Sequence, residues 1–394
     1  MLSRPPQPTP TQRQPLHIRQ LLKLLRVGRN ICTRSTYADI RALVQSCCAF
    51  RGLCEHLNIL KQARAVVQSG GRGGEDPLDH DNSLVGLQLI LHKGSIVSGL
   101  SQCTLVRTMK LTLGHDVDAL PVFGRYLRKL EIECLDPNTD ACWSIRDTSS
   151  LLSCSSLTSL KLTNCNNITS LSLPSTGNLI VLDLQGCRAL RVIANLATCT
   201  SLNTLDIGRC NQLEELDSLA SCKALETLCI VGHRMSSIDS LAACTSLTDL
   251  DMSGCSQIKS IDCLAACTAL TSLNMRECSQ ITLIDSLAAC TALTSLDMGG
   301  CSRITSIDSL AACTALTSLD MDGCDQITSF DSLAACTALE RIYMNGCNGI
   351  ASVDCLAFCA ALTQVHVSKS ANPSRQIQDL TRVLAPGVLN VHNY

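Results

Sequence analysis

Cysteine is the residue type in this sequence with the greatest capacity for chemistry, since 27 of the 394 residues are cysteines. A thiolate can act as a nucleophile, bind zinc or form a disulfide. Most of these cysteines fall in two rows that repeat every 22 or 23 residues. The first row holds Cys165, Cys187, Cys210, Cys255, Cys278, Cys301, Cys324 and Cys347, and the second holds Cys154, Cys199, Cys222, Cys244, Cys267, Cys290, Cys313, Cys336 and Cys359.

Rows of this kind favour a structural role over metal binding. Structural zinc sites bring four ligands together from closely spaced pairs, whereas these cysteines recur one per row in each unit. A small side chain with a weak S–H donor fits a crowded turn and can reach a neighbouring carbonyl group. We therefore predict buried, free thiols, which favours a reducing environment, and we predict neither a metal nor a cofactor.

Catalytic motifs are absent from the sequence. It contains no GxSxG, HExxH, P-loop or dinucleotide-binding motif. Cys229 and His233 are four residues apart, but a strand followed by a turn would direct them to different sides. The sequence therefore predicts a protein that is not an enzyme.

The elements that position these residues are short repeats. "CTALTSLDMGGCSRITSIDSLAA" (290–312) is followed directly by "CTALTSLDMDGCDQITSFDSLAA" (313–335). The L-x-L step is typical of a strand, and the later spacing of three suits turns and short 3-10 pieces. Each unit is predicted to form one coil, and the units begin at Leu157, Leu179, Leu202, Leu225, Leu247, Leu270, Leu293, Leu316, Leu339 and Leu362. Weaker copies from Leu84, Val106 and Leu127 raise the prediction to thirteen coils.

The segment "LTSLDMGGCSRI" (293–304) resembles the leucine-rich repeat superfamily, whose motif is L-x-x-L-x-L-x-x-(N/C)-x-(L/I). The "GCSRIT" and "GCDQIT" segments are similar to cysteine-containing repeats, the unit length is similar to phosphatase-regulator-like repeats, and kinetoplastid leucine-rich repeat proteins look closest. The resemblance covers roughly residues 84–368. It implies an α/β fold, a curved solenoid with a parallel β-sheet on its concave face, turns with short or 3-10 helices on its convex face, and no catalytic residue.

The chain ends are predicted to differ from the repeats. Residues 1–36 form a basic, proline-rich leader, and 37–83 form a helical cap or docking segment, helical over 37–69, with a glycine-rich linker. Residues 84–368 form the repeat domain, and 369–394 form a C-terminal cap with one short helix ending before Pro386. No segment is apolar enough to suggest a membrane span.

Two rows of aspartates recur in the repeats. Asp239, Asp262, Asp285, Asp308, Asp331 and Asp354 precede "SLAAC"-type segments, and we expect their side chains to cap short helices. A second column lies between the two strand leucines and should point into the concavity: Asp183, Asp206, Asp251, Asn274, Asp297 and Asp320.

The concave column is the predicted partner-binding surface. Residues 157–368 contain 10 Lys/Arg and 20 Asp/Glu, a net charge of −10, which repels nucleic acid and favours a basic protein partner. The alternative is a solvated strand surface. Arg276, Arg341, Tyr343 and Asn345 interrupt the repeat and are added to the predicted site.

The sequence thus predicts a monomeric, cytoplasmic scaffold that binds protein through its concave face. Two alternatives remain open by resemblance, a substrate-recognition subunit of an F-box-type ubiquitin ligase and a phosphatase-regulator-like subunit. Residues 1–38 carry seven Lys/Arg and no acidic residue, which leaves a mitochondrial location as an alternative.

Overall fold

A computed structural model describes residues 66–69, 85–91, 106–113, 125–134, 146–213, 216–368 and 374–392. The predicted leader (1–36) and most of the predicted helical cap (37–65) lie outside these residues.

Each coil begins with a short strand whose side chains alternate between the core and the concave surface. In β13 (Ser295–Asp297), Leu296 and the following Met298 are buried, while Ser295 and Asp297 face outward. Strands of successive coils pair in parallel and in register, so that Leu296 lies between Leu273 and Leu319. Because each coil repeats the pattern of the one before it, equivalent side chains of successive coils stack into continuous rows.

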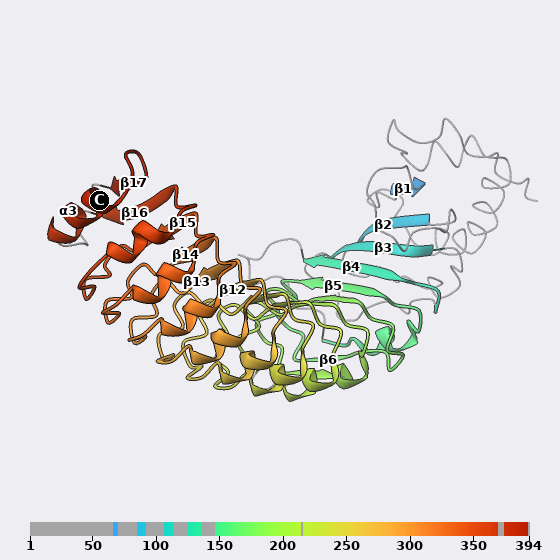
Figure 1. Cartoon of the computed structure of the whole chain (residues 1–394). Helices are drawn as coiled ribbons and strands as arrows, with labels where there is room; N and C mark the ends of the chain where they lie inside the picture. The colour runs from blue at the N-terminus through green and yellow to red at the C-terminus, as the bar shows by residue number, and fades with distance from the viewer. Residues whose placement is uncertain are drawn as a thin grey trace, which may run out of the picture.

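The strands form one 15-stranded sheet, in which only β1 and β2 pair antiparallel. Thirteen strands, β2 to β5, β7 and β9 to β16, correspond to the thirteen predicted coils, which confirms that prediction. The sheet lines the inner side of an arc (Figure 1). Its strands are β1 (Val66–Ser69), β2 (Val85–Leu91), β3 (Val106–Leu113), β4 (Lys129–Cys134), β5 (Ser159–Thr163), β7 (Val181–Asp183), β9 (Thr204–Asp206), β10 (Thr227–Cys229), β11 (Asp249–Asp251), β12 (Ser272–Asn274), β13, β14 (Ser318–Asp320), β15 (Arg341–Tyr343), β16 (Gln364–Ser368) and β17 (Leu389–His392).

The outer side of the arc carries 3-10 helices, as predicted (Figure 1). In the repeat of η8, backbone bonds join Leu310 N to Ile307 O and Cys313 N to Leu310 O, both at 2.9 Å, and Leu310 is buried. These helices are η2 (Ser149–Ser153), η3 (Leu196–Thr198), η4 (Asp217–Ser221), η5 (Asp239–Ala243), η6 (Asp262–Ala266), η7 (Asp285–Ala289), η8 (Asp308–Ala312), η9 (Asp331–Ala335) and η10 (Asp354–Phe358). A two-stranded parallel sheet of β6 (Ser170–Ser172) and β8 (Val192–Ala194) lies beside them.

The turn after each strand needs a residue with positive φ. Gly254, Gly300, Gly323 and Gly346 have φ between 72° and 77° at this place, where glycine meets no steric penalty. Glu277 occupies the same place with φ 61°. Its coil therefore adopts the common turn at a steric cost that its neighbours avoid.

The N-terminal end of the described sheet differs from the prediction. Residues 66–69 were predicted to be helical, but they form β1, which pairs antiparallel with β2. The β-branched pair Val66 and Val67 favours a strand when a partner edge is present, because pairing satisfies its backbone groups.

The C-terminal end is closed by a helix and one further strand. Helix α3 (Ser374–Val383) confirms the predicted short helix before Pro386. Leu380 is fully buried, and Gln376 Nε2 donates to the carbonyl of Cys347 at 3.1 Å. Strand β17, which was not predicted, extends the sheet by pairing with β16. These contacts cover the apolar cross-section of the last coils.

Candidate functional site

The first cysteine row links successive coils through sulfur donors. Cys278 Sγ donates to Met252 O and Cys301 Sγ to Met275 O, both at 3.1 Å. The acceptor lies in the preceding coil each time, and the same bond is made by Cys187, Cys210, Cys255, Cys324 and Cys347. These side chains satisfy strand carbonyls that would otherwise be buried without a partner. Their role is structural.

His233 takes the place of cysteine in this row. Its Nε2 lies 2.6 Å from Ile207 O, and because a carbonyl only accepts, Nε2 is the protonated nitrogen. Burial lowers the pKa of His233, which keeps its ring neutral near pH 7. Cys229 is half-buried at the outward position of β10, whereas His233 is in the core. The pair therefore has no shared surface on which to act as a nucleophile and base.

The second row repeats the arrangement behind the 3-10 helices. Cys313 Sγ lies 3.3 Å from Leu287 O, and Cys336 Sγ lies 3.3 Å from Leu310 O. In both rows, burial raises the pKa of the thiols, to about 11 for Cys255, Cys267 and Cys290. It also raises that of Cys222, Cys301, Cys336 and Cys347 to about 12. These thiols stay protonated near neutral pH and are poor nucleophiles.

The cysteines from Cys154 to Cys359 are free thiols. Within the part of the chain that the structure describes, no three His, Cys, Asp or Glu side chains are placed to hold a metal ion.

The convex aspartates do not cap the 3-10 helices, so that prediction is wrong. Asp262 and Asp308 are the first residues of η6 and η8, and neither helix has a side-chain capping bond from its N-cap residue. Instead, the serine two residues earlier accepts the aspartate N–H, as Ser260 Oγ does at 3.0 Å. Ser237, Ser306, Ser329 and Ser352 make the same bond. Each aspartate follows the N-cap position, which an isoleucine occupies in these two helices, so the residue placed to make the capping bond has no side-chain acceptor.

The concave column does bond to the backbone. Asp297 Oδ1 accepts the N–H of Gly299 at 2.9 Å, and Asp320 Oδ1 accepts that of Asp322 at 2.9 Å. Asp183, Asp206, Asp251 and Asn274 make the equivalent bond two residues ahead. All six are half-buried and on the outward side of their strands. Burial raises the pKa of Asp206 and Asp320 in spite of these bonds.

Arg276 lies across this column and pairs with two of its acids. Its Nη1 is 3.3 Å from Asp320 Oδ2 and 3.7 Å from Asp297 Oδ1. A Cβ at Gly299 would lie 2.7 Å from the Arg276 guanidinium, so glycine at that position leaves room for the arginine to reach the next coils. Lys161 likewise pairs with Asp183 at 3.3 Å. The sequence showed Arg276 as an interruption of the repeat, but it did not show the pairing of Arg276 with Asp297 and Asp320, which lie 21 and 44 residues further along the chain.

Asp206 and Asp251 are the acids of the column that have no ion-pair partner among the described residues. Asp249 is exposed on the same strand as Asp251. The carboxylates of the concave face that have no ion-pair partner therefore lie around β9 to β11. On either side of them, Lys161 and Arg276 partly neutralise the neighbouring aspartates.

The C-terminal part of the predicted site is internally bonded. Tyr343 stacks on His366 with ring centroids 4.4 Å apart, and His366 Nδ1 lies 3.1 Å from His392 Nε2. Asn345 is held by two bonds to Asp322, at 2.7 and 2.8 Å. Arg341 is exposed. Sequence reasoning missed Asp322, His366 and His392 as partners of these residues, because the contacts depend on strand pairing and on β17.

The fold is a solenoid of stacked parallel-stranded coils with side-chain rows inside. Residues 291–335 match the family described as "Leucine Rich repeats (2 copies)", and the same leucine and cysteine positions recur in the neighbouring coils. Residues 291–335 are thus leucine-rich repeats, and the described part of the chain folds as a leucine-rich repeat solenoid.

Solved structures with a similar fold include three from bacteria and plants. The domain of InlJ from Listeria monocytogenes, described as including a cysteine ladder, is 18% identical, covers 71% of this chain and 67% of its own, and has a TM-score of 0.49. Internalin InlF from the same species is 16% identical over 80% of this chain and 91% of its own, with a TM-score of 0.43. The ectodomain of the receptor kinase GASSHO1/SCHENGEN3 from Arabidopsis thaliana is 18% identical over 71% of this chain and 41% of its own, with a TM-score of 0.40.

A comparison with curated protein sequences gave no match. In the described part of the chain, no helix has both the length and the apolar character needed to cross a bilayer.

Proposed function

We propose that this protein is a non-catalytic scaffold that binds a protein partner through the concave face of its repeats. The observation that carries the proposal is the set of oriented carboxylates around β9 to β11. In Asp206 and Asp251, Oδ1 is fixed by a backbone N–H at 2.9 and 3.0 Å. The Asp206 carboxylate is also bonded to the Cys229 thiol, and in Asp251 Oδ2 is left available to a ligand. A side chain that is already oriented loses less conformational entropy when it binds.

Basic side chains are the partner groups that fit this surface. A lysine or arginine of the partner would meet the two carboxylates that have no ion-pair partner in the described structure. Arg276 adds a positive charge beside them, so the partner must match a pattern of both signs. The excess of acidic residues over the repeats disfavours nucleic acid as the ligand.

A reducing compartment suits this protein, and we place it in the cytoplasm as a monomer. Its rows of buried free thiols would be exposed to mispairing during folding in an oxidising compartment. A mitochondrial location is the alternative carried by the basic N-terminal sequence. No observation on the described residues favours a ubiquitin-ligase or a phosphatase-regulator role over a simple scaffold.

The test is partner capture with two variants of equal charge. Asp206→Asn combined with Asp251→Asn removes two concave charges and keeps the backbone bonds, as Asn274 shows. The control, Asp285→Asn combined with Asp308→Asn, removes two charges from the convex side. A partner identified with the wild-type chain should bind the control variant normally and the concave variant about tenfold more weakly, mostly through slower association at low salt.

Equal binding of both variants over a range of salt concentrations would contradict the proposal. The identity of the captured proteins separates the alternatives, since ligase adaptors or a phosphatase would point to the two roles set aside above.

A further inference from the structure

On the loops that lead from the strands to the 3-10 helices, several residues differ in type from the residues at equivalent places in the other coils. These loops form a lateral face between the concave and convex sides (Figure 1). In three consecutive coils, one loop residue in each departs from the type most common at its place in the central repeats: Leu283, Arg303 and Asp325. All three line one hollow.

Leu283 replaces a serine that has a structural role in other coils. Ser260 and Ser306, at the same place in the two neighbouring coils, accept the N–H of the first residue of the next helix at 3.0 Å. Leucine cannot accept this bond. Its side chain is also 58% exposed, one of four large apolar residues in the described structure with such exposure. The coil thus gives up a bond and exposes an apolar side chain, which is expected at sites selected for binding.

Arg303 and Asp325 bring opposite charges to positions that are neutral in most central coils. Gln257, Gln280 and Gln326 occupy the place of Arg303, and Ser256, Ser279 and Ser302 occupy that of Asp325. Arg303 Nη1 donates to Gln280 Oε1 at 2.7 Å, and within the described residues it forms no ion pair. Asp325 accepts a bond from Gln326 at 3.4 Å and is exposed.

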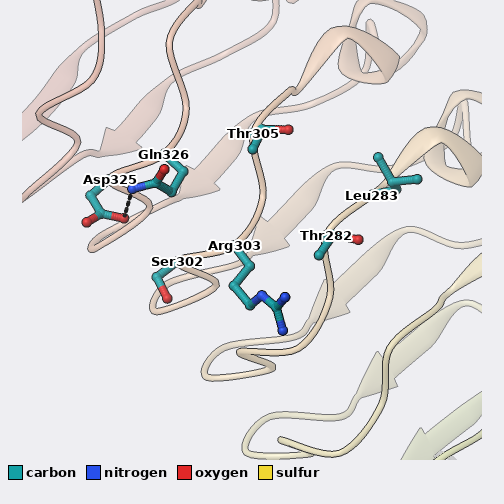
Figure 2. A pocket seen from close by; sticks show the side chains of 7 residues that line it. All are labelled: Thr282, Leu283, Ser302, Arg303, Thr305, Asp325 and Gln326. Atoms are coloured by element: carbon teal, nitrogen blue, oxygen red, sulfur yellow. Dashed lines mark hydrogen bonds between the residues drawn. The ribbon is translucent and has the colours of Figure 1, made fainter.

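The hollow has a volume of about 520 Å³ and is lined by Thr282, Leu283, Ser302, Arg303, Thr305, Asp325 and Gln326. Figure 2 shows that Arg303 belongs to the coil between those of Leu283 and Asp325 and that its side chain extends toward the coil of Leu283. Along the axis of the array, the order is therefore apolar, positive and negative.

We propose that this hollow docks an extended segment of a partner protein, with an apolar side chain against Leu283, an acidic side chain at Arg303 and a basic side chain at Asp325. Adjacent parallel strands are about 4.8 Å apart, so the three groups span about 10 Å, the length of three to four extended residues. The charges favour one direction of the peptide. The site is separate from the concave face and does not depend on the function proposed for it.

A random linear peptide library displayed on phage provides the probe, with the full chain as the target. The variants restore the type of residue found in neighbouring coils, Leu283→Ser, Arg303→Gln and Asp325→Ser, so each should fold at least as well as the wild type. The matched control is Lys259→Thr, which makes the same kind of change outside the hollow. The concave variant Asp206→Asn with Asp251→Asn serves as a second control.

Selected peptides should contain an apolar, an acidic and a basic residue within about four positions. Their synthetic forms should bind each hollow variant about tenfold more weakly and both controls normally. The proposal is overturned if no peptide is selected, if the selected peptides lack these residues, or if they bind the three hollow variants as tightly as the wild type.

Discussion

The aspartate that ends most strands of the central coils has two functions at the level of a single residue. In Asp320, Oδ1 accepts the N–H two residues ahead, and Oδ2 faces Arg276 across the concave surface. The bond satisfies a backbone donor in a tight turn, and it also orients the charge. Asn274 keeps the first function and loses the second.

Substitution of Asp251 separates these two functions. Asp251→Ala should lower the free energy of unfolding by about 1 kcal/mol, because the N–H of Ser253 loses its acceptor. Asp251→Asn should change it by less than about 0.5 kcal/mol. Urea denaturation measures both, and equal effects of the two substitutions would contradict the role assigned to the carboxylate.

The buried thiols predict how stability depends on pH. An unfolded thiol has a pKa of about 8.5, whereas burial raises the pKa of folded thiols such as Cys267 and Cys301 to about 11 and about 12. The contribution of these thiols to the free energy of unfolding should therefore be constant up to about pH 8 and fall above it, by about 1.4 kcal/mol per pH unit for each such thiol. Unfolded chains release these protons first, so alkali favours unfolding.

Denaturant titrations between pH 7 and pH 10 test this expectation, with thiol labelling as a second measurement. Labelling of the wild-type chain at pH 7 should be slow until denaturant is added. A free energy of unfolding that stays flat to pH 10, or rapid labelling of the native chain, would show that the thiols are accessible.

At the scale of the element, each coil has a fixed turn between strand and loop that requires positive φ. Glycine fills this place in most coils, and the coil of Glu277 shows how far the sequence can depart from the rule. That coil also contains Arg276 and Leu283. Its turn and its lost serine bond both make it less stable than the coils on either side.

Replacement of Glu277 by glycine should stabilise the protein. Glu277→Gly removes the steric cost of φ 61° and should raise the free energy of unfolding by about 1 kcal/mol. The matched control is Gly323→Glu in the next coil but one, where φ is 75°, and it should lower stability by a similar amount. Thermal unfolding gives both values, and a lower melting temperature for Glu277→Gly would mean that the Glu277 side chain makes a compensating contact.

At the scale of the whole molecule, the array is an open arc whose ends must be covered (Figure 1). Each coil packs mainly against its neighbours, and the pair of Arg276 with Asp320 reaches one coil further. Stability is therefore approximately a sum of local terms. The C-terminal end depends on α3 and β17, which cover the last buried leucines and valines.

Weakening of this end should open the last coils before the centre. Leu380→Ala removes a fully buried side chain and should cost about 2–5 kcal/mol locally. Hydrogen exchange should then rise in β15 to β17 and stay unchanged in β9 to β12. Uniform exchange throughout the array would show that the coils unfold as one unit. Small-angle scattering of the wild-type chain should report an elongated shape.

The sequence by itself determined the coils, their period, the two cysteine rows and the outward position of Asp251 and Asp297. These follow from local periodicity, because each coil repeats one pattern of apolar residues and stacks on a copy of itself. The sequence did not determine which row of aspartates bonds to backbone N–H groups. The convex aspartates would be N-cap residues if their helices began one residue later, and the sequence pattern does not fix a helix start that finely. Only the tertiary structure decided the pairing of Arg276 with Asp297 and Asp320, the stack of Tyr343 on His366, and the hollow beside Leu283. These contacts join residues of different coils, and their geometry depends on the register and spacing of the stacked strands.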